Sequence, residues 1–239
     1  MHRRFVVQVV TGLLMAGFFL FAISLYGRFT AYIAINKERL DPLGIGELTE
    51  GSKNISYKIA FFGDSRALAW GNYLAKQGIE ILNLGMANQT SAQARYRIDY
   101  QSNTLDLDYI VIQIGINDLK QINSSGSNYQ SIVNQCKSNI GYIALKAKAM
   151  AKTVVLSTIF PPGEPPVWRR FFMSEKVIDA VNEVNAYIRG IEGVEVYNAH
   201  EFLVGEDGYV KSIYFRDTLH INERAYIEMD LLSSFETAK

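Results

Sequence analysis

The feature that most constrains the fold of this 239-residue chain is a repeated alternation of short apolar runs with helical patterns. The apolar runs lack a polar residue at every second position, which is typical of strands buried on both faces. They cover residues 58–62, 79–84, 109–114, 153–159 and 194–197. The helical patterns cover residues 66–76, 91–101, 128–151, 174–189 and 222–234. Strands that alternate with helices of this length indicate a parallel sheet with helices on both faces, a three-layer α/β/α domain.

An uncharged apolar segment precedes this domain at residues 5–27. A helix that spans a bilayer needs about 20 such residues. Arg3 and Arg4 precede the segment, which favours a cytoplasmic N-terminus with the remainder of the chain across the membrane. The alternatives are a signal peptide cleaved after the small residues near Ser24, or a buried core helix. We expect an anchor or signal peptide over residues 1–27, a stalk over 28–57 and a globular domain over 58–239.

The composition excludes several kinds of site and partner. Lys plus Arg and Asp plus Glu both number 24, so the net charge does not favour nucleic acid as a partner. Cys136 is the single cysteine, which excludes an internal disulfide and a cysteine-rich zinc site. The chain has only three histidines, which disfavours a histidine-rich metal centre. We therefore expect no metal and no organic cofactor, and the oligomeric state stays open.

Ser65 follows the first predicted strand and opens the first predicted helix, within the segment Phe61-Phe62-Gly63-Asp64-Ser65-Arg66. This places it at the carboxyl end of a strand, where open α/β sheets bind their ligands. Free backbone N–H groups at a helix start also stabilise developing negative charge. The competing interpretation is that Asp64 or Ser65 is merely an N-cap.

Three further features fall on the same edge of the predicted sheet. Gly85 ends the second strand, Gly115-Ile116-Asn117-Asp118 ends the third, and Asp217-Thr218-Leu219-His220 precedes the last helix. Each has a structural explanation by itself, as a turn or a helix start. Together they offer the groups that an acyl-transfer site needs: a nucleophile, a base, a group that orients the base, and oxyanion donors.

The roles follow from the chemistry of each group. Ser65 is the candidate nucleophile, and a histidine is the side chain suited to accept its proton near neutral pH. His220 is the candidate base, because His2 precedes the apolar segment and His200 has no acidic residue placed like Asp217. Asp217 can accept the Nδ1–H of His220 and so orient the ring.

The candidate oxyanion donors are the backbone N–H groups of Ser65 and Gly85 and the side-chain amide of Asn117. Asp118 cannot donate while it is ionised, so we expect a structural role for it. A proline-rich loop over residues 160–172 also leaves the carboxyl edge of the sheet. It is either a stiff surface connection or a rim that faces the substrate.

These segments resemble the four signature blocks of the SGNH hydrolases, also called the GDSL esterase/lipase family. Gly63-Asp64-Ser65 matches the first block, although Arg66 replaces the leucine that gives the family its name. The other three features match the remaining blocks in order. The segment that follows the fourth block, residues 221–226, is similar to the family's continuation, except that Ala225 stands where a glycine is common. The resemblance covers residues 57–235. It implies a flavodoxin-like fold, a triad of Ser65, Asp217 and His220, and an oxyanion hole of Ser65, Gly85 and Asn117, and we expect Arg66 to shape the substrate pocket.

This resemblance predicts a serine esterase that acts on an ester or O-acyl group of a small molecule, a glycan or a lipid. From the N-terminal apolar segment, we expect this enzyme to be anchored at the membrane and to work outside the cytoplasm. The first alternative is an O-acyltransferase that passes the acyl group to a cell-surface glycan through the same residues. The second is a non-catalytic surface or assembly protein on the same scaffold. A nucleotide-binding protein is disfavoured, because the chain lacks the glycine-rich phosphate-binding motifs.

Overall fold

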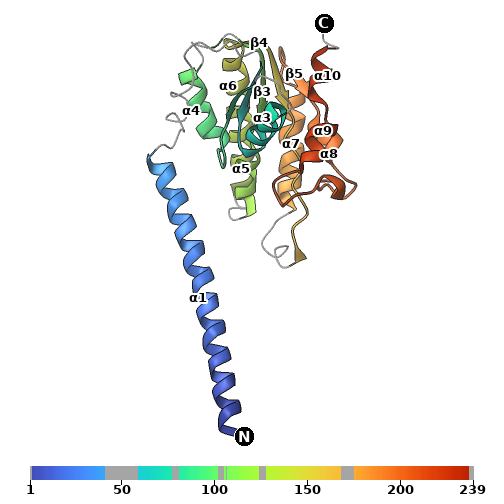
Figure 1. Ribbon diagram of the computed structural model, residues 1–239. Coiled ribbons are helices and arrows are strands. Elements are labelled where there is room, and N and C mark those ends of the chain that lie inside the picture. Colours follow the sequence, from blue (N-terminus) through green and yellow to red (C-terminus); the bar gives the residue numbers. More distant parts are fainter. Residues whose placement is uncertain are drawn as a thin grey trace. The chain divides into compact units, whose positions relative to one another are not determined.

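The computed structural model describes residues 2–40, 59–76, 81–101, 105, 107–123, 128–167 and 175–236. The chain divides into two compact units, Met1–Gly46 and Glu47–Lys239. The described part of the first unit is one helix, α1 (His2–Leu40) (Figure 1). Its stretch Val7–Phe29 has 23 residues and a mean hydropathy of 2.1, so it is long and apolar enough to cross a membrane. The helix continues through residues 28–40, the first part of the predicted stalk, and the rest of that stalk lies outside the described residues.

The second unit is built on a five-stranded parallel sheet with the strand order β2-β1-β3-β4-β5. This arrangement confirms the predicted flavodoxin-like sheet. Each predicted strand is present, and each of its ends lies within two residues of the predicted position. The strands are β1 (Ile59–Gly63), β2 (Ile81–Gly85), β3 (Leu107–Gln113), β4 (Ala151–Ser157) and β5 (Glu195–Tyr197).

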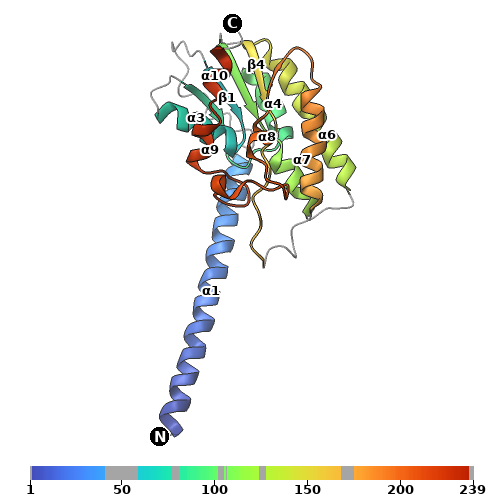
Figure 2. The same cartoon turned by 90° about the vertical axis from the view of Figure 1, so that its right-hand side faces the viewer.

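Helices cover both faces of this sheet. Figure 2 shows α6 and α7 on one side, and α3, α9 and α10 on the other. The helices of this unit are α3 (Ser65–Lys76), α4 (Ser91–Gln101), α5 (Ile116–Leu119), α6 (Tyr129–Ala147), α7 (Lys176–Arg189), α8 (Ala199–Leu203), α9 (Glu223–Glu228) and α10 (Leu231–Glu236), with 3-10 turns η1 (Lys120–Asn123) and η4 (Ser212–Tyr214). The prediction of one closing helix over 222–234 is wrong, because Asp230 adopts a φ of +40° and separates α9 from α10.

The core explains why the strand sequences are apolar without alternation. On one face of the sheet, Phe62 and Ile112 are fully buried in a cluster with residues of α4, α6 and α7. On the other face, Phe61 and Val111 are fully buried in a second cluster, which surrounds Trp70 of α3. Successive residues of one strand therefore enter different cores, so both faces need apolar side chains.

Trp70 connects the elements that surround the carboxyl edge of the sheet. Its ring lies 5.6 Å from the ring of Phe61, 5.7 Å from that of Phe160 and 6.0 Å from that of Tyr226. These residues belong to β1, to the loop after β4 and to α9. Aromatic pairs at such distances stabilise a core beyond the burial of their area. The cluster thus holds the loop after β4 and the C-terminal helices against α3.

Candidate active site

Ser65 lies at a sharp turn between β1 and α3. Gly63 ends the strand with a φ of +148°, and a Cβ atom there would lie 1.8 Å from the backbone oxygen of Gln113. Only glycine meets both conditions. Asp64 follows, and its Oδ1 accepts the backbone N–H of Arg66 at 2.8 Å, which caps the helix. Ser65 is therefore the first residue of α3, at the carboxyl edge of the sheet.

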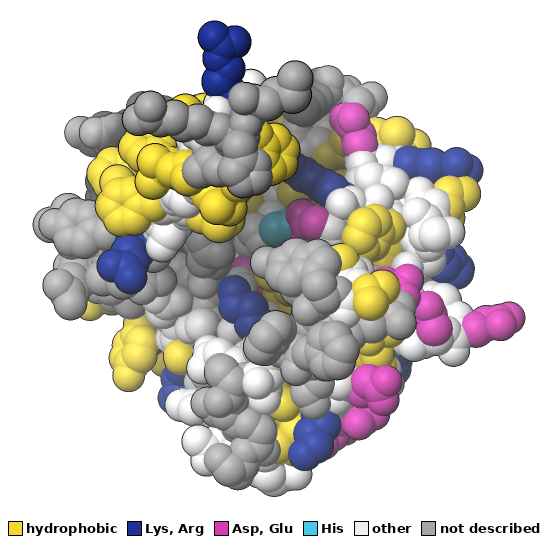
Figure 3. Space-filling model, turned by 90° about the horizontal axis from the view of Figure 1, so that it is seen from below, with side chains coloured by type: hydrophobic (Ala, Val, Ile, Leu, Met, Phe, Trp, Pro, Cys, Tyr) yellow, Lys and Arg dark blue, Asp and Glu magenta, His cyan; other side chains and the backbone are white. Residues whose placement is uncertain are grey.

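The structure brings Ser65, His220 and Asp217 together in one chain of hydrogen bonds. Ser65 Oγ lies 3.0 Å from His220 Nε2, although 155 positions separate the two residues. His220 Nδ1 lies 3.0 Å from each carboxylate oxygen of Asp217. Figure 3 shows a histidine beside an acidic side chain in a hollow of the molecular surface. This arrangement suits a nucleophile, its base and the carboxylate that orients the base.

Asp217 is itself held by the turn that contains it. Its Oδ1 accepts the backbone N–H groups of Leu219 and His220 at 2.8 and 2.9 Å. Partial burial raises the pKa of the Asp217 carboxyl, but these two N–H groups and the His220 ring outweigh it, so the pKa lies below its usual range. The carboxylate is therefore ionised at neutral pH and accepts hydrogen bonds only.

Asn117 lies in α5, which starts after Gly115 at the end of β3. Its Nδ2 donates to the backbone oxygen of Gln89 at 3.0 Å, and its Oδ1 accepts from Lys120 Nζ at 2.7 Å. An amide nitrogen has two hydrogens, so one remains for a ligand. The ammonium group of Lys120 fixes which way the amide faces.

Asp118 is buried and bonded to the first residue of α4. Its two carboxylate oxygens accept the backbone N–H and the Oγ–H of Ser91 at 2.8 and 2.7 Å. Burial raises the pKa of this carboxyl, and the Ser91 bonds oppose that rise. These contacts give Asp118 the structural role predicted for it, as a link between α5 and α4.

Gly85 has a packing reason of its own. A Cβ atom at this position would lie 2.2 Å from the backbone nitrogen of Leu68, so only glycine lets the end of β2 approach α3 so closely. Its N–H donates to Asn83 Oδ1 at 3.1 Å. Asn88, three residues further on, is exposed and has a φ of +63°. The backbone N–H of Gly85, which the sequence predicts to bind the oxyanion, is therefore already bonded to Asn83.

Two further buried side chains of this unit are those of Arg66 and His200. Arg66 is fully buried, and its guanidinium group donates to backbone oxygens of the loops after β4 and before α9, so the prediction that it shapes the substrate pocket stays a prediction. The remaining described histidine of this unit, His200, is buried in α8, and burial with the nearby Arg189 lowers its pKa to about 4. Within the described ranges, no group of three or more His, Cys, Asp or Glu side chains is placed to hold a metal ion.

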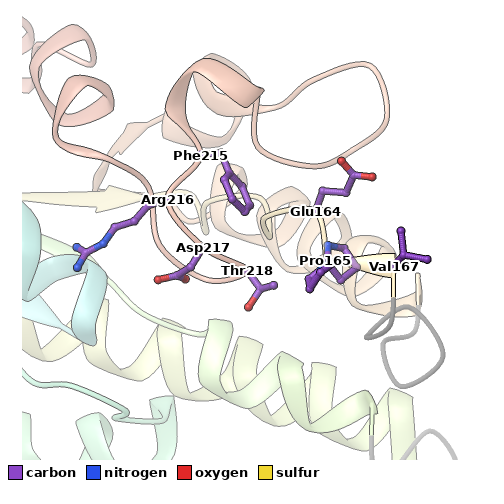
Figure 4. Close-up of a pocket in the computed structure, with 8 residues that line it drawn as sticks. Glu164, Pro165, Val167, Phe215, Arg216, Asp217 and Thr218 are labelled. Carbon is purple, nitrogen blue, oxygen red and sulfur yellow. The ribbon is translucent and has the colours of Figure 1, made fainter.

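A pocket of about 550 Å³ adjoins Asp217 (Figure 4). The loop after β4 and the loop before α9 form its two walls. Figure 4 shows Glu164, Pro165 and Val167 on the first wall and Phe215, Asp217 and Thr218 on the second. The lining residues are Glu164, Pro165, Pro166, Val167, Phe215, Arg216, Asp217 and Thr218. The described part of the proline-rich loop therefore lines a pocket beside the triad, and its residues 168–172 lie outside the described residues.

Comparison with known proteins places the chain in a family. The model of the GDSL-like lipase/acylhydrolase family matches residues 48–226. The chain belongs to this family. The predicted resemblance is therefore confirmed, and Arg66 stands in this GDSL-family member where the family name has leucine. Among curated proteins, none matches the chain.

Solved structures similar to this GDSL-family chain share its fold at low sequence identity. A protein from Streptococcus pneumonia, described as a platelet activating factor, has 18% identity and a TM-score of 0.64, over 87% of this chain and 98% of its own. A GDSL-like lipase from Bacteroides thetaiotaomicron has 21% identity and a TM-score of 0.60, over 82% and 97%. Est24, a carbohydrate acetylesterase from Sinorhizobium meliloti, has 19% identity and a TM-score of 0.51, over 76% and 98%.

Proposed function

We propose that this GDSL-family protein is a serine esterase that works through an acyl-enzyme on Ser65. The observation that carries the proposal is the continuous hydrogen-bonded chain from Ser65 Oγ through His220 to Asp217. Family membership supports ester hydrolysis as the class of reaction. A non-catalytic scaffold has no need for these three groups in this order.

In the proposed reaction, Ser65 Oγ attacks the carbonyl carbon of the ester while His220 Nε2 takes the hydroxyl proton. The tetrahedral intermediate collapses, and His220 returns the proton to the departing alcohol oxygen. Water then attacks the acyl-enzyme with His220 again as base, which releases the acid and restores Ser65. Asp217 holds the ring so that Nδ1 keeps its hydrogen and Nε2 faces Ser65.

The oxyanion of each intermediate needs preorganised donors. Asp64 Oδ1 accepts the backbone N–H of Arg66 and not that of Ser65. The N–H of Ser65, in the first turn of α3, is therefore proposed as a donor to the oxyanion. Asn117 supplies its second amide hydrogen. Gly85 can also donate to the oxyanion only if its N–H breaks its hydrogen bond to Asn83 Oδ1.

The pocket beside Asp217 is proposed to hold the group attached to the scissile ester. Pro165, Val167 and Phe215 provide apolar surface, and Glu164 and Arg216 provide charge at the same pocket. This mixture suits a ring with one apolar face and polar edges, such as an acylated sugar. Est24, the structurally similar carbohydrate acetylesterase, shares this fold. We propose that α1 anchors the enzyme, with the catalytic unit outside the cytoplasm.

The test is labelling with a fluorophosphonate, which reacts with an activated serine. We expect the wild-type protein to be labelled at Ser65, as peptide mass spectrometry would show, and the variant Ser65→Ala to remain unlabelled. Ser157→Ala, which removes the hydroxyl of a buried serine in β4, is the matched control and should be labelled like the wild type. Equal labelling of the wild type and Ser65→Ala would refute the proposal. Free acid and transferred acyl groups, measured with an O-acetylated saccharide, then separate hydrolysis from acyl transfer.

A further inference from the structure

We infer that Arg66 is a positioning residue, which holds the loop of His220 against the helix that carries Ser65. The inference rests on the proposed function, because it concerns the base of that reaction. Arg66 is next to Ser65 in the chain, and its side chain is fully buried. A guanidinium group remains charged in proteins and is rarely buried without partners, so its partners define what it does.

The guanidinium group donates to three backbone oxygens. Nε donates to the oxygen of Leu219 at 2.7 Å, Nη1 to that of Phe160 at 2.9 Å, and Nη2 to that of Pro161 at 3.4 Å. The group also lies 5.4 Å from the centroid of the Phe160 ring. One planar side chain thus joins α3 to the loop before α9 and to the loop after β4.

The bond to Leu219 is the one that bears on the base, because Leu219 directly precedes His220. The turn around these residues is bonded within itself: Asp217 Oδ1 accepts two of its N–H groups, and the backbone oxygen of His220 accepts those of Arg216 and Asp217. The contact between Asp217 and His220 is therefore local. The contact between His220 and Ser65 joins residues 155 positions apart, and the Arg66–Leu219 bond joins the same two segments across 153 positions.

Arginine is suited to this task because its donors form a rigid fork. A leucine, as in the family name, donates no hydrogen bond and would leave three carbonyl groups, two of them in buried contacts, without this partner. A lysine retains the charge on a single nitrogen that cannot reproduce the fork. The Ser65–His220 distance would then depend on the remaining packing, and a displacement of about 1 Å can slow a reaction by on the order of 10²-fold.

The first experiment compares the wild type with Arg66→Leu and Arg66→Lys. We expect kcat and the rate of fluorophosphonate labelling at Ser65 to fall by on the order of 10²-fold in Arg66→Leu, and KM to change little, because Arg66 is buried away from the substrate. Arg66→Lys should lie between the two, and it serves in place of Arg66→Leu if that variant does not fold. Val184→Ala, in the buried face of α7, is the control that loses stability but keeps kcat.

The second experiment is a double-mutant cycle with His220→Ala. If Arg66 acts through His220, Arg66→Leu should cause no further loss of the residual rate once the imidazole is absent. The same fold loss in both backgrounds would overturn the inference, as would wild-type kinetics of Arg66→Leu. A wild-type protein without labelling at Ser65 would instead refute the proposed function itself, so the two failures are distinguishable.

Discussion

At the scale of single residues, the region around Ser65 contains charged groups that are removed from water. Asp64 and Arg66 flank the serine and are both fully buried. Burial raises the pKa of the Asp64 carboxyl to about 6, and the charge and N–H of Arg66 oppose that rise. Among the described residues, Asp64 Oδ2 has no hydrogen-bond partner, which accounts for the cost of ionising this carboxyl.

This buried carboxyl predicts a dependence of stability on pH. Asp64 binds its proton more tightly in the folded than in the unfolded chain, so the free energy of unfolding falls as pH rises from about 4 through 6. Asp64→Asn keeps the acceptor for Arg66 N–H and cannot ionise. Relative to the wild type, it should gain on the order of 3 kcal/mol across this range, measured by urea unfolding. Asp207→Asn, at an exposed turn, is the control, and a difference between Asp64→Asn and wild type that is constant with pH would contradict the prediction.

At the scale of elements, two loops meet tightly beside the triad. Gly163 of the loop after β4 donates its N–H to the backbone oxygen of Thr218 at 3.0 Å. A Cβ atom at Gly163 would lie 2.2 Å from the oxygen of Asp217 and 2.8 Å from Phe215 Cε2. The two walls of the pocket therefore depend on a glycine at this contact, and the Asp217 carboxylate, which is hydrogen-bonded to His220, lies on one of them.

We therefore predict that Gly163→Ala separates the two loops. Overpacking at a tight contact costs about 1–3 kcal/mol of stability, and here it should also lower kcat/KM for a substrate that fills the pocket. Thermal unfolding and steady-state kinetics measure the two effects. Gly190→Ala is the matched control, because its added methyl would meet its nearest neighbour at 3.5 Å, an ordinary contact. Equal behaviour of the two variants would show that the loops can adjust.

At the scale of the whole molecule, the chain combines a compact unit, in which Ser65, His220 and Asp217 are hydrogen-bonded to one another, with an apolar helix that belongs to another unit. The described side chains of α1 between Val7 and Phe29 are exposed, including Phe18, Leu14 and Tyr26. Exposed apolar surface of this extent is unfavourable in water and favourable in a bilayer.

The corresponding prediction concerns location. Arg3 and Arg4 precede the apolar stretch, so we expect the catalytic unit outside the cytoplasm, tethered through an intact α1. Cell fractionation and mass spectrometry of the mature N-terminus measure this directly. We expect the protein in the membrane fraction, with protease sensitivity of the catalytic unit from outside only. A mature chain that begins near Leu25 would show a cleaved signal peptide instead and would leave the esterase proposal unaffected.

The parts of the protein that were predictable from sequence are those encoded by local patterns. Burial on both faces of the sheet requires uninterrupted apolar strands, so the strands and the parallel sheet were evident from the sequence. The places of Ser65, Asn117 and His220 at strand and loop ends followed from the same alternation. The split between α9 and α10 was missed, because the backbone conformation of Asp230 leaves no mark in a hydrophobic pattern.

The tertiary structure alone decided which partners these residues have. The N–H of Gly85 is taken by Asn83, whose orientation depends on its bonds to Leu68 and Asn72 of α3. Arginine is usually exposed at the protein surface, yet Arg66 is buried. Its burial depends on hydrogen bonds to carbonyl groups that lie 94 and 153 positions away in the chain. A hydrogen bond depends on the distance and angle between two atoms, and for partners so far apart in the chain only the packed fold sets these quantities.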